Sequence, residues 1–178
     1  MTDAQPGTHG TVHPIVRYGD PVLHRPCEPV TEFDDALATL VEDMFASMYA
    51  VEGVGLAANQ IGVGARVFVL DCRDADSRRT VAHVVNPTLI ESPPPRELMI
   101  GDEGCLSVPG QFAELARVSY AEVTGFDIHG DVVTVAGTGQ LARCLQHETD
   151  HLDGSVYVDR LPKRVRKKVL NAAGLSPK

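Results

Sequence analysis

The sequence predicts an α+β fold with antiparallel β-sheet, and three observations support this. One amphipathic segment typical of a helix comes first, segments rich in Val and Phe follow, and two further helical segments end the chain. The 178 residues suffice for one domain and are too few for two separate hydrophobic cores. We therefore expect a flexible N-terminal segment at residues 1–13 and a single domain at residues 14–178.

The first predicted helix begins at a capping pattern formed by Thr31 and Asp34. Apolar residues then recur at steps of three and four, which predicts an amphipathic helix of about four turns. These residues are Leu37, Leu40, Val41, Met44, Phe45 and Met48. The helix is expected to end before Gly53, where a glycine-rich segment begins.

Strands are expected at residues 66–71 and 81–86, which are short and rich in Val and Phe. Three consecutive prolines at residues 93–95 exclude regular structure and indicate a loop or turn. Apolar and polar side chains alternate through residues 118–135, with an interruption at residues 129–131. This pattern is typical of a β-hairpin.

Two helices are predicted after the hairpin. The first spans about residues 140–153, and Gly154 is placed to cap its C-terminus. The second begins near Pro162, a residue suited to the first turn of a helix. It carries a run of basic residues, namely Lys163, Arg164, Arg166, Lys167 and Lys168.

Composition narrows the possible classes of protein. No apolar run approaches the roughly 20 residues that a bilayer span requires, and the N-terminus lacks the apolar core of a secretory signal. We therefore expect a cytoplasmic protein without membrane association. The net charge of −8 disfavours extensive nucleic-acid binding, since neutralising phosphates requires a cationic surface. In a reducing compartment, one or more of the four cysteines is expected to be a metal ligand or a buried apolar side chain; they are Cys27, Cys72, Cys105 and Cys144.

The segment at residues 147–151 reads H-E-x-x-H within a predicted helix. Residues four apart project from one helical face, so His147 and His151 can reach one cation while Glu148 leans toward the same place. The segment therefore supplies two metal ligands and a base. The alternative is a solvated helix face that contains two histidines by chance.

A catalytic site of this kind usually needs a third protein ligand and keeps a fourth position for water. No glutamate follows Glu148, so the ligand of thermolysin-like peptidases is missing, and Tyr157 stands where metzincins have their final histidine. Cys144, three residues before His147, and the distant Cys105 are both eligible. Spacing alone leaves the choice open, and a buried thiol is the alternative for either cysteine.

Three segments taken together resemble the motifs of peptide deformylases. Residues 53–60 read G-x-G-x-A-A-x-Q, residues 103–107 read E-G-C-L-S, and residues 147–151 read H-E-x-x-H, in the order and spacing of that family. The likeness covers roughly residues 14–170. It implies a bacterial-type enzyme in which antiparallel sheets pack around a central helix carrying H-E-x-x-H, with an N-terminal and a C-terminal helix.

The resemblance also implies a function and a metal. A member of this family is a metal-dependent amide hydrolase that removes the formyl group from the N-terminal formylmethionine of nascent polypeptides and releases formate. Cys105, His147 and His151 would be the metal ligands. The implied ion is ferrous iron, with zinc, nickel or cobalt as substitutes. The domain at residues 14–178 would then be catalytic.

Catalytic and substrate-binding roles follow from the same resemblance. Glu148 would be the general base and acid. The side-chain amide of Gln60 and the backbone N–H of Leu106 would hold the oxyanion formed when water attacks the formyl carbon. Four residues are expected to bind substrate, namely Gly55, Val54, Arg117 and Cys144.

Two arginines carry open alternatives. Arg143 stands where relatives usually have an apolar residue, and it either adds charge to the rim of the methionine pocket or points into solvent. Arg117 either pairs with Asp150 or binds the substrate backbone.

The basic C-terminal helix is either a solvated face or, as in some deformylases, a ribosome-docking element.

Other functions are less well supported by the residues. The hypothesis of a zincin-type metallopeptidase is weakened by the missing downstream ligand. A non-catalytic relative that keeps the metal for stability is disfavoured, because a structural metal needs none of Gln60, Leu106 and Glu148.

Overall fold

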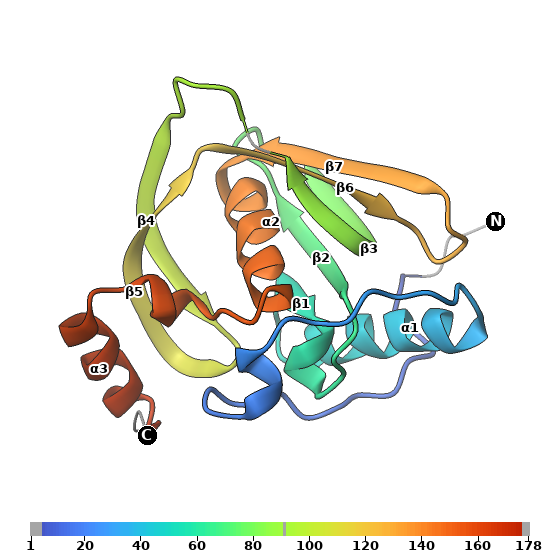
Figure 1. Cartoon of the computed structure of the whole chain (residues 1–178), viewed down its shortest axis with the longest axis horizontal. Helices are drawn as coiled ribbons and strands as arrows, with labels where there is room; N and C mark the ends of the chain where they lie inside the picture. Colours follow the sequence, from blue (N-terminus) through green and yellow to red (C-terminus); the bar gives the residue numbers. More distant parts are fainter. Residues whose placement is uncertain (1–4, 91, 176–178) are drawn as a thin grey trace.

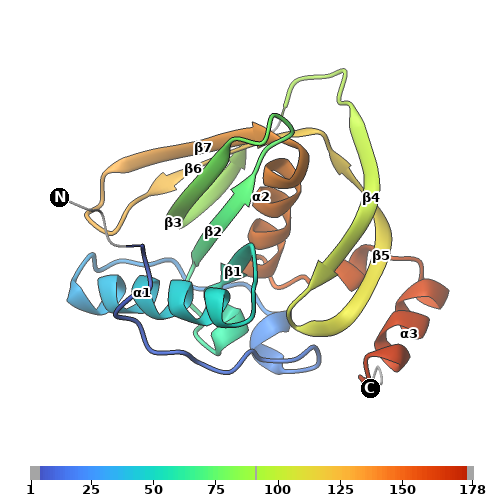
Figure 2. The ribbon, with the colours of Figure 1, turned by 180° about the vertical axis from the view of Figure 1, so that it is seen from behind.

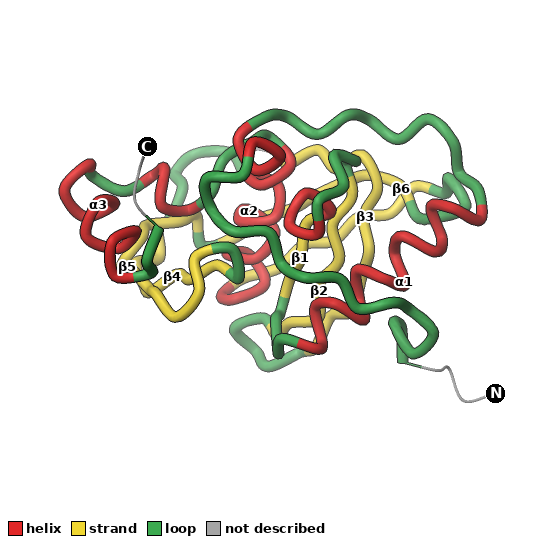
Figure 3. The backbone as a smooth tube through the Cα atoms, turned by 90° about the horizontal axis from the view of Figure 1, so that it is seen from below, coloured by secondary structure: helices red, strands yellow, loops and turns green. Residues whose placement is uncertain are grey.

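The computed structural model describes residues 5–90 and 92–175. They form a five-stranded antiparallel sheet, a separate two-stranded antiparallel sheet and three α-helices (Figure 1). The helix α2 (Gly139–Leu152) lies between the two sheets, an arrangement that Figure 3 shows from below. The expected α+β class, with antiparallel sheets around a central helix, is confirmed.

The five-stranded sheet has the strand order β1-β2-β3-β6-β7. Its strands are β1 (Gly55–Ala57), β2 (Val67–Arg73), β3 (Arg79–Ile90), β6 (Tyr120–Phe126) and β7 (Val132–Thr138). Each strand pairs antiparallel with its neighbour, and the β3–β6 register shifts between Val85 and Thr88.

The strand β2 is covered on both faces. Phe68 and Leu70 pack into the apolar cluster that contains α2, whereas Val67 and Val69 pack into the cluster that contains α1 (Asp35–Ala50). Figure 2 shows α1 and α2 flanking the sheet. Successive side chains of a strand point to opposite faces, so a strand between two helices reads as a continuous apolar run. The sheet thereby fixes α2 at the centre of the molecule.

The two-stranded sheet lies on the other side of α2 (Figure 1). It consists of β4 (Leu98–Cys105) and β5 (Val108–Val118), and its register shifts between Gly104 and Cys105. Beyond β5, α3 (Lys163–Ala172) packs its buried Val169 and Leu170 against the cluster that contains the end of β4.

Local chemistry explains where the helices begin and end. Asp34 itself caps α1, because its carboxylate accepts hydrogen bonds from the backbone N–H groups of Ala36 and Leu37. The capping pattern that starts at Thr31 was therefore placed too early. Gly154 follows α2 with a φ of 80°, and a side chain there would meet the backbone of Arg25 at 2.6 Å.

Several other boundaries differ from the predictions. The hairpin is formed by β6 and β7 and ends at Thr138, and β3 extends beyond the predicted residues 81–86 on both sides. The strands β1, β4 and β5 were not predicted. Pro162 is the N-cap of α3, one position before its first turn.

The N-terminal residues from position 5 run along α1. The backbone N–H groups of Gly7 and Thr11 donate to the carboxylates of Glu42 and Asp43, and that of His13 donates to Ser47. Residues 1–4 lie outside the described residues, so the flexibility expected for residues 1–13 stays a prediction. Within the described ranges, no helix combines the length and apolar character needed to cross a membrane.

Candidate metal centre and active site

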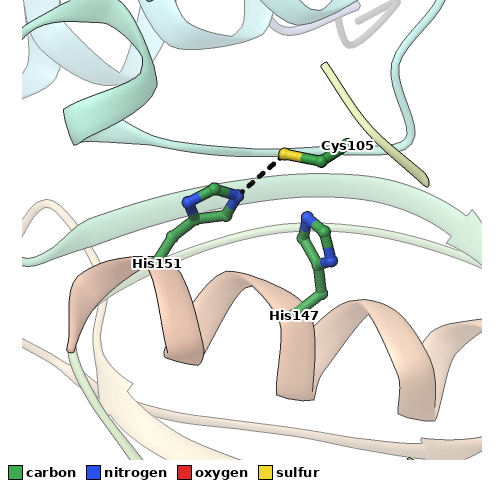
Figure 4. A group of neighbouring side chains, drawn as sticks. All are labelled: Cys105, His147 and His151. Atoms are coloured by element: carbon green, nitrogen blue, oxygen red, sulfur yellow. Dashed lines mark hydrogen bonds between the residues drawn. The ribbon is translucent and has the colours of Figure 1, made fainter. Parts of the chain in front are cut away.

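Three buried side chains from α2 and β4 converge on one point (Figure 4). His147 and His151 project from the same face of α2, with ring centroids 4.9 Å apart. Cys105 ends β4, and its Sγ lies 3.2 Å from Nε2 of His151. One ligand atom from each residue lies within 4.8 Å of the others. This geometry suits a single cation.

Cys144 lies apart from this group. Its Sγ is 3.8 Å from the backbone oxygen of Val54, and no metal-binding group found among the described residues includes it. A hydrogen bond with the thiol of Cys72, together with burial, raises the pKa of Cys144 well above its usual value. Cys144 is therefore a neutral thiol in the cavity wall, and the fold separates two cysteines that spacing left equivalent.

The carboxylate of Glu103 supports His147 from behind. Nδ1 of His147 lies 2.7 Å from Oε1 of Glu103. Since a carboxylate only accepts hydrogen bonds, Nδ1 carries the hydrogen and Nε2 is left to face Cys105 and His151. Glu103 was not singled out from the sequence, although it is the first residue of the E-G-C-L-S motif.

Glu103 is charged despite its burial. Burial by itself raises its pKa, but hydrogen bonds from His147 and Arg117 lower it overall, well below the usual range. Arg117 is also buried, and it donates to Asp150 across a distance of 2.8 Å. Of the two alternatives for Arg117, the structure therefore shows the ion pair with Asp150. Arg117 does not line the cavity beside the metal group.

The two histidines differ in protonation. Burial and the neighbouring His147 lower the pKa of His151 well below its usual value, so His151 is a neutral imidazole. Burial also lowers the pKa of His147, but hydrogen bonds with Cys105 and Glu103 raise it overall. The metal-free protein therefore holds His147 in its protonated form, with a hydrogen on each ring nitrogen. A cation that binds at Nε2 must displace the proton of that nitrogen, so metal binding releases a proton.

Glu148 lies beside the three candidate ligands and lines the cavity. Burial raises its pKa to about 7. Its Oε2 atom is buried and has no hydrogen-bond partner within the described part of the chain. An unpartnered carboxylate oxygen with a pKa near neutrality can take a proton and return it.

Gly55 is required by the close approach of β1 to Glu148. A Cβ at this position would collide with Oε1 of Glu148 and would lie 2.7 Å from Sγ of Cys144. The glycine therefore lets a strand edge pass directly beside the carboxylate. This explains why β1 begins inside a glycine-rich segment.

Gln60 lies in the 3₁₀ turn that follows β1, and its amide has a fixed orientation. Oε1 accepts a hydrogen bond from the backbone of Ala57 at 3.0 Å. Nε2 donates to Oγ of Ser107 at 3.2 Å and lies 3.5 Å from Sγ of Cys105. The donor end of the amide thus faces the metal group. Leu106, the residue after Cys105, lines the same cavity.

A cavity of about 780 Å³ opens beside these residues, within the range of small-molecule sites. Arg143 is part of its wall and donates to Glu103, so this arginine adds charge to the cavity and does not simply point into solvent. Arg117 and His151 are set back from it. Most of the sequence-predicted site residues line the cavity, namely Val54, Gly55, Gln60, Cys105, Leu106, Cys144, His147 and Glu148.

The residues fit a divalent transition metal. One thiolate and two imidazoles form a soft donor set that suits iron, zinc, cobalt or nickel. The carboxylate behind His147 is the usual support for such a ligand. A cation, a nearby base and a fixed amide donor together can hydrolyse a carbonyl compound.

Comparisons with known proteins agree with this chemistry. The model of the family described as polypeptide deformylase matches residues 12–167. "Peptide deformylase 2" of Streptomyces avermitilis is 56% identical over 172 residues, which cover 97% of this chain and 91% of that protein. A peptide deformylase of Acidothermus cellulolyticus is 48% identical, and the match covers 90% of this chain and 85% of that protein.

Solved structures are similar over nearly the whole chain. The crystal structure of peptide deformylase from Ehrlichia chaffeensis superposes with a TM-score of 0.85 at 34% identity, covering 92% of this chain and 96% of that chain. The crystal structure of peptide deformylase from Thermus thermophilus gives a TM-score of 0.78 at 41% identity, covering 91% of this chain and 93% of that chain.

Proposed function

The chain belongs to the peptide deformylase family, and on that premise we propose a role for each residue of the site. Its function is the metal-dependent hydrolysis that removes the formyl group from the N-terminal formylmethionine of nascent polypeptides and releases formate. The observation that best supports the proposed roles is the convergence of Cys105, His147 and His151 beside Glu148.

The metal is a divalent ion, and we propose ferrous iron in the cell, with zinc, nickel or cobalt as substitutes. Its ligands would be Sγ of Cys105 and the Nε2 atoms of His147 and His151. When bound, a divalent ion supplies Lewis acidity, which lowers the pKa of water and polarises a carbonyl oxygen. An oxidisable ion beside a thiolate would also make the enzyme sensitive to oxygen.

Glu148 would move the protons of the reaction. Its unpartnered Oε2 accepts a proton as the water oxygen forms a bond with the formyl carbon. When the carbon–nitrogen bond breaks, the same carboxyl group returns the proton to the amine of methionine. The products are formate and a free N-terminus.

Gln60 and Leu106 would stabilise the oxyanion that forms in between. The amide donor of Gln60 already faces the site, because Ala57 holds its oxygen. A donor held in place before the reaction needs no reorganisation in the transition state. The backbone N–H of Leu106 would be the second donor.

Gly55 and Val54 would bind the peptide at the edge of β1. Gly55 allows close approach of backbone to backbone. Cys144, a neutral thiol in the cavity wall, would line the pocket for the methionine side chain, since a thiol behaves there as a small apolar group.

We further propose that the enzyme works in the cytoplasm and that the basic face of α3 docks on the ribosome. Four of its charged side chains are exposed, namely Lys163, Arg164, Lys167 and Lys168. A cationic face suits contact with RNA phosphates in an otherwise acidic protein. Ribosome co-sedimentation that is unchanged after reversing these charges would instead leave α3 as a solvated helix face.

Formate release from formyl-Met-Ala-Ser tests the proposed roles. Protein purified anaerobically and loaded with iron or nickel should release formate, whereas Glu148→Ala and Cys105→Ser should lose most of this activity. Each variant also needs a metal assay, because only Cys105→Ser should lose metal. Full activity of Glu148→Ala with bound metal would refute the role of Glu148 as the base.

A further inference from the structure

Arg143 makes contacts that connect the two halves of the metal site. It lies on α2, one helical turn before His147. Its Nη1 donates to Oε2 of Glu103 at 2.8 Å and to the backbone oxygen of Leu115 at 3.0 Å. Its Nη2 packs against Gly101, where a Cβ would lie only 3.4 Å away. One guanidinium thus joins α2 to both β4 and β5.

We propose that Arg143 is a positioning residue of the metal centre, an inference that rests on the proposed ligands. Each oxygen of Glu103 accepts two hydrogen bonds. Oε1 accepts from His147 and Arg117, while Oε2 accepts from Arg117 and Arg143. Arg143 therefore holds the carboxylate in the rotation that keeps Oε1 on the metal-binding imidazole.

The position of Arg143 matters because the ligands come from separate elements. His147 and His151 belong to α2, whereas Cys105 belongs to β4. The apolar cluster that contains much of α2 differs from the cluster that contains Cys105. Met99 of β4 packs against the cluster of α2 but Cys105 does not belong to it, so side-chain hydrogen bonds help to set the distance between helix and strand near the metal ligands.

These hydrogen bonds form a ladder along one face of α2. Arg143 bonds to β4 and β5, Gln146 bonds to both backbone groups of Val118, and Asp150 bonds to Arg117. Residues at steps of three and four lie on one helical face, so the three contacts all join the same side of α2 to the two-stranded sheet. Of the three, only Arg143 lines the cavity.

Loss of Arg143 should weaken metal binding. Removal of groups that support a metal ligand typically lowers affinity by about 10- to 100-fold. Glu103 keeps three of its four hydrogen bonds in Arg143→Leu, so we expect about a tenfold loss, at the lower end of that range. Arg143→Lys keeps the charge, so its loss of affinity should be smaller than that of Arg143→Leu. Some loss should remain, because lysine lacks the planar group that bonds to both Glu103 and Leu115.

The experiment measures the Kd for Co²⁺ by competition with a chelator under anaerobic, reducing conditions. The wild type is compared with Arg143→Leu, Arg143→Lys and Arg17→Leu. Arg17 is the matched control, because it also lines the cavity but is not a partner of Glu103. The visible spectrum of the Co²⁺ protein reports the ligand geometry independently of activity.

The proposal predicts weaker Co²⁺ binding and an altered spectrum in Arg143→Leu, with Arg17→Leu unchanged. Equal affinity and an unchanged spectrum in the wild type and Arg143→Leu would overturn it. If Arg143→Leu does not fold, Arg143→Lys decides in the same way. Failure of the wild type to bind Co²⁺ would overturn the proposed metal centre itself.

Discussion

Replacing Glu148 by Gln should stabilise the metal-free protein while it removes the activity. The carboxyl group is buried, and its Oε2 has no hydrogen-bond partner among the described residues. Its pKa is raised by burial from 4.5 to about 7. The folded protein therefore prefers the neutral form, which glutamine imitates in shape and charge.

The sign and size of the effect follow from these two pKa values. Below pH about 4.5, Glu148 is neutral in the folded and the unfolded state, so the variant gains nothing. As the pH rises, ionisation favours the unfolded chain, until the folded state also ionises near pH 7. The difference between the two pKa values corresponds to about 3 kcal/mol of stability lost by the wild type above pH 7.

Urea denaturation of the metal-free proteins at pH 5, 6, 7 and 8 measures this effect. The free energy of unfolding of Glu148→Gln should exceed that of the wild type by a margin that grows with pH toward about 3 kcal/mol. Glu114→Gln, at an exposed position on β5, is the control and should change little. A margin that is the same at every pH would refute burial as the cause.

Three further predictions concern the site. Gly55→Ala should lower kcat/KM on the order of 100-fold, because the new Cβ displaces Glu148 and Cys144; wild-type kinetics would contradict the close approach. Gln60→Leu should lower kcat about 100-fold with little change in metal content, and an equal rise in KM alone would argue against an oxyanion donor. Deformylation should rise with pH as Glu148 loses its proton, with an acid limb at or below pH about 7, since a nearby cation lowers the pKa further. A rate that stays constant from pH 5 to 8 would contradict this role.

Much of the fold could be predicted because local patterns specify it. The apolar spacing of α1 and the alternation through β6 and β7 each reflect one packing face, whereas the continuous apolar run of β2 reflects packing on both faces. The two-stranded sheet was missed for a physical reason. Residues 98–118 combine glycines, a proline and charged side chains, because β4 and β5 bury polar side chains such as Glu103 and Arg117 on one face and are exposed on the other.

The site was predictable where motif and periodicity coincide, as at His147 and His151. Spacing alone could not choose the third candidate ligand, and the choice of Cys105 came from the family resemblance, because Cys105 and Cys144 are separated only by the way β4 folds against α2. The contacts of Arg117 and Arg143 with Glu103 also join residues far apart in the sequence. A periodic pattern contains no information about such partners, so these roles emerge only from the tertiary structure.

The most direct test of the central claim is a metal titration of deformylase activity. Ferrous ion is added anaerobically to metal-free protein, and formate release from formyl-Met-Ala-Ser is measured together with bound iron. The account predicts no activity without metal, a linear rise up to one bound ion per chain, and a plateau beyond it. Formate release by the metal-free protein, or bound metal without any formate release, would contradict it.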